Sequence, residues 1–279
     1  MSAVVARALT KSFGATVAVD GLDLSVTGGE IVGLLGANGA GKTTAMRMLL
    51  GLLAPTSGEV LVEGMPVSGV DRRLMGYVPQ GLGLYRDLTV AENLRFVASV
   101  FGVDPPDLEA EDLAALADRR VGEISLGARR RVAFAAARCH SPRVLVLDEP
   151  TSGVGPLGRA RLWETIHDTA AAGTAILVST HHMDEAEECD QVVLMAGGRK
   201  VAAGSVADIV GGLRVVEVAG SIGDADVRRL GSRGGTALHT GRGTRIVGLD
   251  AGSLIEILGV GTATEVPATF EEAFVALSR

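Results

Sequence analysis

The sequence predicts an α/β fold in which a mostly parallel sheet is covered by helices on both faces. Strand-like and helix-like segments alternate along the first 211 residues, an order that favours right-handed crossovers between parallel strands. Two segments, residues 30–35 and 143–148, have apolar interiors, as expected for strands buried on both faces. A glycine-rich loop at residues 36–44 follows the first of these strands and precedes a helix-like segment. The loop therefore lies at the carboxyl end of a strand, where open α/β sheets bind ligands.

The other elements of this fold are predicted in chain order from hydrophobic periodicity and turn residues. Strands are expected at residues 3–9, 17–26, 59–63, 74–78, 175–179, 191–196 and 199–203. Helices are expected at residues 45–50, 89–101, 108–117, 125–139, 157–172 and 183–189. The second of these helices begins with a capping box, because Thr89 can cap it and Glu92 lies three residues further on.

Beyond residues 211–212 the composition shifts toward glycine, and the chain has a second, shorter series of elements. Strands are expected at residues 214–218, 236–240, 245–249 and 262–266, and helices at residues 224–230, 253–258 and 270–277. This βαββαβ order with a final helix is typical of a ferredoxin-like module. An irregular tail folded onto the first domain is the alternative. The predicted domains are therefore residues 1–211 and a small α+β module at residues 212–279.

The loop at residues 36–44 reads GANGAGKTT and fits the phosphate-binding pattern G-x-x-x-x-G-K-[ST]. Its glycines let the backbone N–H groups point inward, and the following helix presents its positive end to the same place. Lys42 is expected to reach the terminal phosphates, and the Thr43 hydroxyl to bind Mg²⁺. The residues expected to bind nucleotide are Gly36, Ala37, Asn38, Gly39, Ala40, Gly41, Lys42, Thr43 and Thr44.

A second strand supplies the acids that hydrolysis requires. Asp148 ends the apolar strand at residues 143–148 and is expected to hold Mg²⁺ directly or through water. Glu149 follows it and can take a proton from an attacking water. Two acids before Pro150 are also compatible with a simple turn, but that reading is weak beside a phosphate-binding loop. The sequence has no Asn-Lys-x-Asp element for reading guanine, so specificity for GTP is not supported.

Three further polar or aromatic residues are candidates for the same site. Gln80 follows the strand at residues 74–78, and its amide could coordinate Mg²⁺ and orient water. His181 follows the strand at residues 175–179 and could donate a hydrogen bond to the γ-phosphate. Phe13 could stack on adenine. Taken singly, a loop amide, a surface histidine and a core aromatic residue are equally good interpretations.

The composition excludes several other classes of protein. Apolar residues make up 47% of the 279 residues, as in globular proteins, and no apolar run approaches the ~20 residues that span a bilayer. The first residues lack the features of a signal peptide, so a cytosolic location is expected. A net charge of −7 argues against nucleic acid as a partner, and residues 129–131 (three arginines) are interpreted as a solvated helix face. Cys139 and Cys189 have no metal-ligand spacing.

The order and separation of the motifs resemble the ATP-binding subunits of ABC transporters over residues 1–211. The motifs that carry this resemblance are GANGAGKTT, GYVPQ, ISLGARRR, VLVLDEPTSG and STHHMDEAE. Within that family the chain is most similar to ATPases of bacterial drug and antibiotic exporters, through TKSFGATVAVDGLDL, STHHMDEAEECD and the ending PATFEEAFVAL. The resemblance implies the P-loop NTPase fold of the ABC type, with a helical subdomain at about residues 81–141.

The resemblance also implies roles for individual residues and partners. Phe13 would stack on adenine, Gln80 would be the Q-loop glutamine, Glu149 the catalytic base and His181 the switch histidine. Two ATP-binding subunits would form a head-to-tail dimer, with ATP between the phosphate loop of one and the signature sequence of the other. Membrane-spanning subunits would dock near Gln80 and residues 89–139, which places the protein on the cytoplasmic face of the membrane. ATP and Mg²⁺ are the expected ligands, and export of a drug-like molecule is the expected function.

The chain departs from its family at the residues offered to a partner. The family signature LSGGQ reads here as Ile124 followed by Ser125, Leu126, Gly127 and Ala128. Leu126 replaces a glycine, and a branched side chain there could hold a phosphate away. The aspartate of the next motif, SGLDP, is replaced by Gly155, and the stretch at residues 102–124 looks about one helix shorter than usual.

These departures suggest a heterodimer in which a second subunit supplies an intact signature, with a homodimer as the other possibility. A mainly ATP-binding, regulatory partner with little turnover is the alternative function, although the retained Glu149 argues against complete loss of hydrolysis. A soluble ABC-type ATPase of translation or repair is disfavoured, because those proteins usually carry two such domains or large insertions.

Overall fold

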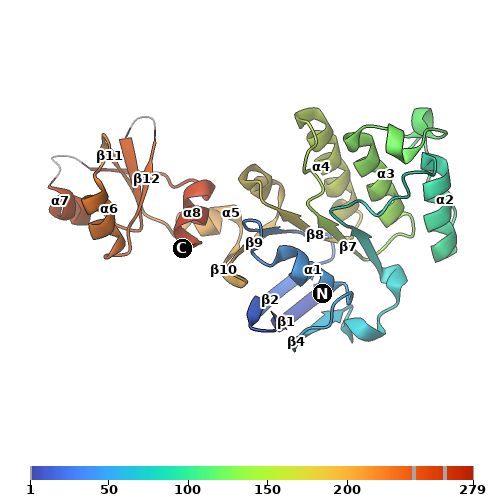
Figure 1. Cartoon of the computed structure of the whole chain (residues 1–279), viewed down its shortest axis with the longest axis horizontal. Helices are drawn as coiled ribbons and strands as arrows, with labels where there is room; N and C mark the ends of the chain where they lie inside the picture. Colours follow the sequence, from blue (N-terminus) through green and yellow to red (C-terminus); the bar gives the residue numbers. More distant parts are fainter. Residues whose placement is uncertain (1, 241–242, 260–262, 279) are drawn as a thin grey trace. The chain divides into compact units, whose positions relative to one another are not determined.

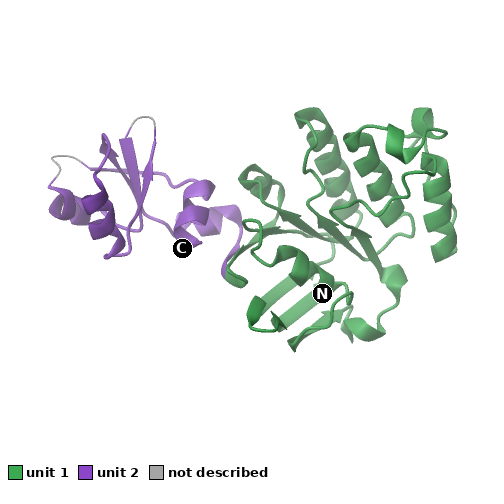
Figure 2. Ribbon diagram, viewed as in Figure 1, with its two compact units in different colours: residues 1–200 green, residues 201–279 purple. Residues whose placement is uncertain are grey.

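The computed structural model describes residues 2–240, 243–259 and 263–278, in two compact units at residues 1–200 and 201–279 (Figure 2). The strands of the first series are β1 (Ser2–Phe13), β2 (Thr16–Thr27), β3 (Ile31–Leu35), β4 (Ser57–Val62), β5 (Met65–Pro66), β6 (Met75–Val78), β7 (Val144–Asp148), β8 (Ala175–Thr180), β9 (Gln191–Ala196) and β10 (Arg199–Gly204). The α-helices between them are α1 (Lys42–Leu49), α2 (Val90–Phe101), α3 (Leu126–Arg138) and α4 (Pro156–Ala171). The predicted strands and these four helices are thus confirmed.

The central sheet has the strand order β10-β9-β3-β8-β7-β6 (Figure 1). Strand β3 pairs in parallel with β8 and β9, and β7 pairs in parallel with β6 and β8. Every residue of β3, β7 and β8 is buried, which explains their continuous apolar sequences. Because these strands are parallel, the segments that follow β3, β6, β7 and β8 meet at one edge of the sheet.

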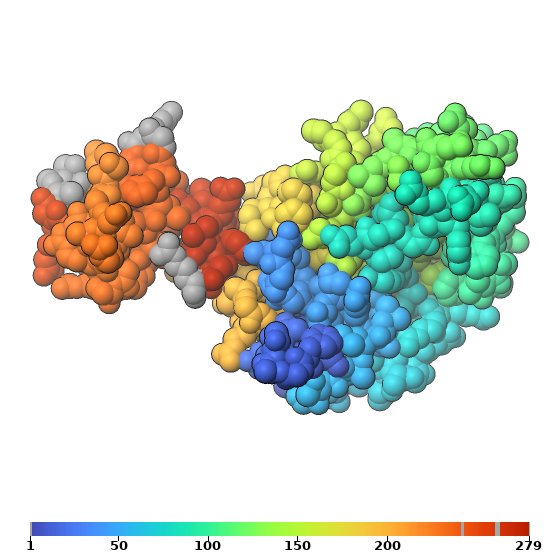
Figure 3. All heavy atoms as spheres, in the orientation of Figure 1, coloured from blue at the N-terminus to red at the C-terminus, as the bar shows by residue number. Residues whose placement is uncertain are grey.

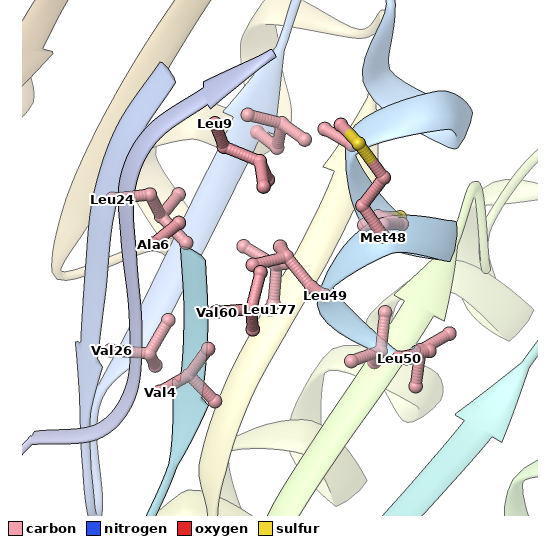
Figure 4. Close-up of a cluster of buried hydrophobic side chains, with 14 of the residues drawn as sticks. Val4, Ala6, Leu9, Leu24, Val26, Met48, Leu49, Leu50, Val60 and Leu177 are labelled. Carbon is pink, nitrogen blue, oxygen red and sulfur yellow. The ribbon is translucent and has the colours of Figure 1, made fainter. Parts of the chain in front are cut away.

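A second sheet, β2-β1-β4-β5, is antiparallel and encloses the largest apolar core against α1 and the central sheet. Side chains of β1, β2 and β4 face those of α1 and β8 in this core (Figure 4). The labelled residues are Val4, Ala6, Leu9, Leu24, Val26, Met48, Leu49, Leu50, Val60 and Leu177. This core fixes α1, and with it the end of the glycine-rich loop.

Helices α3 and α4 cover the other face of the central sheet, where a second core includes Phe134, Trp163 and Ile166 (Figure 1). Helix α2 packs against α3 through a third cluster around Val90, Leu94 and Val132. The atoms of this part of the chain, coloured cyan to green, form a closely packed surface in the space-filling view (Figure 3). Helix α2 begins with the predicted capping box of Thr89 and Glu92. Helices α2 and α3 lie within residues 81–141, the range expected for a helical subdomain.

The helix predicted at residues 108–117 is wrong. The structure has turns there and a single 3-10 turn at Ala114–Leu116. Asp112 has a positive φ of 52°, which is incompatible with a continuous α-helix. The apolar spacing has another cause: Leu113 is fully buried, and Leu108 and Leu116 pack against the same cluster as α2 and α3. The short helix predicted at residues 183–189 is a 3-10 helix, Met183–Glu188.

The second unit contains α5 (Val206–Gly211), β11 (Val215–Ala219), α6 (Asp224–Gly231), β12 (Thr236–His239), β13 (Gly243–Val247), α7 (Ala251–Leu258), β14 (Thr264–Val266) and α8 (Phe270–Leu277). Its sheet has the order β12-β13-β11-β14 with all neighbours antiparallel. Together with the βαββαβ sequence of elements, this is the ferredoxin-like topology predicted from the sequence.

The second unit begins at Val201 rather than at the predicted residue 212. Helix α5 was not among the predicted elements. Its start is marked by a capping box of Ser205 and Asp208, and it contacts α8 of the same unit. The first residue of the strand predicted at 262–266, Thr262, lies outside the described residues. In the described ranges no helix has the length and apolar character needed to cross a membrane.

Candidate functional site

The glycine-rich loop between β3 and α1 has a backbone that only glycine fits. Gly41 has a φ of 99°, and a Cβ there would lie 2.4 Å from the backbone oxygen of Ala18. A Cβ on Gly36 would lie 2.5 Å from the backbone oxygen of Met195. Helix α1 then starts without a side-chain cap and without an acidic residue in its first turn. Its first N–H groups are therefore free to bind an anion.

Lys42 is buried at the base of this loop, with 5% of its surface exposed. Its Nζ donates hydrogen bonds to the backbone oxygens of Gly36 and Ala37, at 2.6 Å and 3.2 Å. Burial lowers the pKa of Lys42, while the charges of Glu149 and Asp148 act in the opposite direction. The ammonium is thus held in the loop by neutral carbonyls, and a phosphate there would gain a direct charge partner.

Asp148 ends β7 next to the start of α1, and 1% of its surface is exposed. Its Oδ1 accepts a hydrogen bond from Ser179 Oγ at 2.6 Å, and Thr43 Oγ1 lies 3.4 Å away within hydrogen-bonding geometry. Its Oδ2 is buried without a hydrogen-bond partner among the described residues. An unpartnered carboxylate oxygen beside a threonine hydroxyl is a donor set that suits Mg²⁺, which usually takes few protein ligands and adds phosphate oxygens and waters. The residues present therefore fit the ion.

Glu149 projects toward Gln80 and His181, which follow the neighbouring strands β6 and β8. Gln80 Nε2 donates to Glu149 Oε2 at 3.2 Å, and His181 Nδ1 lies 3.3 Å from Glu149 Oε1. The backbone of Glu149 has a φ of 49°, an unfavourable value for a non-glycine residue. Two hydrogen bonds hold it there: Glu149 N donates to Ser179 Oγ at 3.0 Å, and Arg130 donates to the Glu149 backbone oxygen at 2.8 Å.

A cavity of about 350 Å³ joins the loop to these polar groups. Its lining consists of Ala18, Asn38, Gly39, Gly41, Lys42, Thr43, Thr44, Gln80 and Glu149. Phe13 is not among them: it ends β1, is 53% exposed, and has Lys11 Nζ 5.2 Å from its ring centroid. The structure thus brings together the loop, Gln80, Glu149 and His181, and leaves Phe13 as an exposed aromatic side chain.

The residues aligned with the signature sequence form the start of α3. Ser125 is the N-cap, and its Oγ accepts a hydrogen bond from Ala128 N at 3.3 Å. The side chain of Leu126 lies over the loop after β7, since a Cβ on Gly153 would be only 2.9 Å from Leu126 Cδ2. Val154 of that loop lies near Gly127, at 3.8 Å from the position of a Cβ there. Leu126 is therefore directed against its own chain.

Gly155 precedes α4 as its N-cap and provides no side-chain hydrogen bond. The first turn of α4 also has no acidic residue, so its N–H groups have neither a side-chain cap nor a compensating charge. An aspartate at this position would supply both.

Three residues in and beside the site were not predicted from the sequence. Ser179 is the polar group that holds both Asp148 and Glu149, and its only sequence signal is a hydroxyl near the end of an apolar strand. Arg130 is 6% exposed and donates to the backbone oxygens of Glu149 and Ser152 at 2.8 Å and 2.6 Å. The interpretation of residues 129–131 as a solvated face is therefore wrong for its middle residue. Thr151 is the third, through its buried contact with Glu185.

This constellation can be compared with known proteins. A family model described as "ABC transporter" matches residues 19–152. The "Nod factor export ATP-binding protein I" of Rhizobium sp. (strain N33) is 42% identical over 225 residues, which cover 75% of this chain and 74% of that protein. The chain belongs to the ATP-binding proteins of ABC transporters. It is an ABC ATPase, a member of a class of enzymes that hydrolyse ATP.

Other relatives of this ABC ATPase agree. The "Probable multidrug ABC transporter ATP-binding protein YbhF" of Escherichia coli (strain K12) is 43% identical over 217 residues, which cover 74% of this chain but only 38% of YbhF. A solved structure described as an ATP-binding subunit of an ABC transporter has a TM-score of 0.68 at 30% identity, covering 74% of this chain and 91% of its own. The cbiO1 protein of Clostridium perfringens, "Part of the ABC transporter complex cbiONQ", has a TM-score of 0.67 at 26% identity, covering 76% and 91%. The P-loop fold of the ABC type is thereby confirmed.

Proposed function

We propose that this ABC ATPase binds ATP with Mg²⁺ at the glycine-rich loop and hydrolyses it with Glu149 as general base. The observation that carries the proposal is the arrangement around Glu149. Its carboxylate faces the cavity of the phosphate loop, with Gln80 and His181 within 3.3 Å of its oxygens. A carboxylate so placed can take a proton from a water that attacks the γ-phosphate.

Each remaining residue of the cavity has a separate task in this proposal. The N–H groups of the loop and of the first turn of α1 bind the phosphate oxygens, and Lys42 offsets their charge. Gln80 orients the attacking water, and His181 donates a hydrogen bond to the γ-phosphate as charge develops on it. Phe13, which is 53% exposed, offers its ring to adenine, and no pocket is needed for such a stacking contact.

Thr43, Asp148 and Gln80 would hold the Mg²⁺. The ion neutralises charge on the β- and γ-phosphate oxygens when it is bound. The buried and unpartnered Oδ2 of Asp148 supports this assignment, because leaving a carboxylate oxygen without a partner costs folding free energy.

The assembly is also part of the proposal. We infer that two ATP-binding subunits pair head to tail, and that separate membrane subunits dock near Gln80 and the helical subdomain on the cytoplasmic face. Relatives named for multidrug transport and for Nod factor export support a role in exporting a small, drug-like molecule. We favour a heterodimer over a homodimer, because Leu126, Ala128 and Gly155 depart from the family pattern on the face that would meet the partner's ATP.

The position of the Leu126 side chain indicates how its departure from the family pattern would affect the partner's ATP site. Its side chain packs over Gly153 of its own chain rather than projecting from the start of α3. We therefore expect the departure at Leu126 to weaken the partner's site by stiffening the loop at residues 151–155, more than by blocking the phosphate itself. The face retains Ser125 as N-cap, so it keeps a helix start for the partner's γ-phosphate.

Replacement of Glu149 by Gln tests the catalytic part of this proposal. The amide keeps the size of the side chain but cannot accept the proton, so hydrolysis should fall by about 10²–10⁴-fold while ATP binding is retained. ATP-dependent dimerisation, measured by light scattering, should become longer-lived. Equal hydrolysis by the two proteins would rule out Glu149 as the base.

Mixing experiments test the assembly and the alternative of a mainly regulatory subunit. We expect weak hydrolysis by the chain alone and faster hydrolysis when a partner ATPase with an intact signature is added. Brisk hydrolysis by the chain alone would contradict the heterodimer. No effect of Glu149→Gln on hydrolysis or on dimer lifetime in the mixture would favour the regulatory alternative.

A further inference from the structure

A buried carboxylate lies just outside the residues assigned so far. Glu185, in the 3-10 helix Met183–Glu188, is 1% exposed, and its Oε1 accepts a hydrogen bond from Thr151 Oγ1 at 2.5 Å. Thr151 is also 1% exposed. A hydrogen bond between a hydroxyl and a carboxylate is short and strong, and it is strengthened further where water is excluded. We call this contact the Thr151–Glu185 bridge.

The bridge joins the two segments that meet at the γ-phosphate side of the site. Thr151 comes two residues after Glu149, and Glu185 comes four residues after His181. The segment of His181 is also attached to α4. Arg159 lies 2.8 Å from Asp184 and 3.7 Å from Glu185 Oε1, and His167 Nε2 lies 3.0 Å from Glu188 Oε2. The two segments follow the paired strands β7 and β8, and the bridge joins them beyond the ends of those strands.

Glu149 needs such contacts because its own backbone is unfavourable. A non-glycine residue with a φ of 49° keeps that conformation only when its surroundings fix it. Arg130 holds the Glu149 and Ser152 carbonyls from the side of α3. The Thr151–Glu185 bridge attaches the same loop to a second neighbour, the segment that carries His181.

Stability alone does not explain the carboxylate of Glu185. Its Oε2 is buried and has no hydrogen-bond partner among the described residues. A buried oxygen without a partner costs folding free energy, and this cost offsets part of what the contacts of Oε1 with Thr151 and Arg159 contribute. A carboxylate present at that cost is consistent with a role in positioning neighbouring groups.

We propose that the Thr151–Glu185 bridge positions Glu149 relative to His181, so that Thr151 and Glu185 are positioning residues for hydrolysis. Neither residue touches the nucleotide cavity; both act through the separation of Glu149 and His181, now 3.3 Å between Oε1 and Nδ1. The inference rests on the proposed ATP hydrolysis. It predicts that loss of the bridge lowers the rate of hydrolysis and leaves ATP affinity unchanged.

The test compares Thr151→Val with Thr151→Ser in the full chain. Valine matches threonine in shape and lacks the hydroxyl, whereas serine keeps it. Under single-turnover conditions with enzyme in excess, we expect Thr151→Val to lower the rate constant of hydrolysis by about tenfold, because small misplacements of catalytic groups have effects of this size or larger. Thr151→Ser should stay within about twofold of the wild type, and the affinity of all three proteins for a fluorescent ATP analogue should agree within the same factor.

Glu185 gives the second half of the test. Glu185→Gln keeps an oxygen that can accept from Thr151 and should retain most activity, whereas Glu185→Leu should be as slow as Thr151→Val. If the two residues act through one contact, the double variant Thr151→Val/Glu185→Leu should be no slower than either single variant. Additive losses, a wild-type rate for Thr151→Val, or equal losses for Thr151→Val and Thr151→Ser would each overturn the inference.

Hydrogen exchange keeps the inference separate from the proposed function. Thr151→Val should raise amide exchange in residues 151–153 and also in residues 181–188, with or without hydrolysis. Increased exchange in the first segment alone would overturn the bridge as a connection. A wild-type chain that binds ATP but hydrolyses none, alone or with a partner, would instead contradict the proposed function and leave the exchange result to decide the bridge.

Discussion

Two faces of this ABC ATPase are built in different ways. The phosphate-loop face consists of residues 36–44 with Asp148 and Glu149, and the signature face consists of residues 124–128 with residues 153–158. On the first, buried polar groups are joined by hydrogen bonds. Ser179 bonds to both Asp148 and Glu149, and Lys42 donates to the backbone oxygen of Gly36 in the loop. On the second, the contacts are apolar: Leu126 packs over Gly153, and Val154 lies against Gly158 of α4. The first face has the features of a site that handles charge, and the second those of a surface that holds its own loop in place.

The comparison teaches why the two faces differ in how much a substitution would disturb the fold. The polar contacts of the phosphate-loop face depend on strands β3, β7 and β8, which are fully buried and whose changes would disturb the core. The signature face depends on the first turns of α3 and α4, which are more exposed. Departures such as Gly155 therefore alter that face without disturbing the fold.

Lys42→Ala should give the largest contrast between the two faces. Loss of the ammonium removes the charge partner of the phosphates, so the affinity for ATP should fall by about 10²-fold, or ~2.7 kcal/mol. Ser125→Ala on the signature face is the matched control and should leave ATP affinity of the isolated chain unchanged. Titration with a fluorescent ATP analogue measures both. Equal losses in the two variants would show that the faces are not separate in the monomer.

Restoring the family residues should give the next largest effect. The triple variant Leu126→Gly/Ala128→Gln/Gly155→Asp reinstates the glycine, the amide and the helix-capping carboxylate of the family pattern. If the signature face limits turnover, steady-state hydrolysis by the chain alone should rise by about tenfold, since individual groups that stabilise a transition state contribute up to 10²-fold or more.

The control for this variant is the same triple substitution together with Glu149→Gln, which should abolish the gain. An unchanged rate in the triple variant would mean that the phosphate-loop face, or the absence of membrane subunits, limits turnover. That outcome would remove the main support for a heterodimer.

The sequence was sufficient to predict the phosphate-loop face because its chemistry is local. The glycines of residues 36–44 set the conformation of that loop. Asp148 ends an apolar strand and Glu149 follows it, and the sequence also predicts that this strand is buried. Parallel strands then bring their carboxyl ends together, which is why Gln80 and His181 could be placed beside Glu149 before the structure was known.

Contacts between segments distant in sequence could not be predicted in the same way. Thr151 and Glu185 are 34 positions apart, and their contact depends on the alignment of β7 with β8 and on a 3-10 helix. Arg130 looked solvated because its neighbours are arginines, yet it is buried by its bonds to two backbone carbonyls. At residues 108–117 three leucines mimic helical spacing while they anchor a loop. In each case packing by another segment decided the outcome.

The apolar contact of the signature face can be tested through stability. A Cβ on Gly158 would lie 2.6 Å from Val154 Cγ1, and valine has little rotamer freedom to move away. Although alanine is the better helix former, Gly158→Ala should lower the free energy of unfolding by about 1 kcal/mol. Gly158→Ala/Val154→Ala should recover part of this loss. Urea unfolding measures both, and a Gly158→Ala variant as stable as the wild type would show that Val154 is not confined.

The smallest expected effect concerns His140. This residue follows the C-terminal end of α3, whereas the signature face lies at the N-terminal end of that helix. Its ring stacks on Phe101 with 3.8 Å between centroids, and its Nε2 lies 3.1 Å from the Met75 backbone oxygen. Burial lowers the pKa of His140 from its ordinary value of 6.5, and the contact with Met75 opposes this only in part. The folded protein therefore favours the neutral ring.

The sign of the pH dependence follows from this lowered pKa. Below about pH 6.5 the unfolded chain binds a proton that the folded chain resists, so stability falls as the pH drops toward the pKa of the folded state. The contribution is fully present above pH 6.5. Because the ring is only half-buried, the change in Tm attributable to it should be at most ~2 °C. His140→Gln keeps a donor for Met75 but does not titrate, so the Tm difference between wild type and variant should shift between pH 7.5 and pH 5. A difference that stays constant over that range would show that His140 protonates equally well in the folded and unfolded chain.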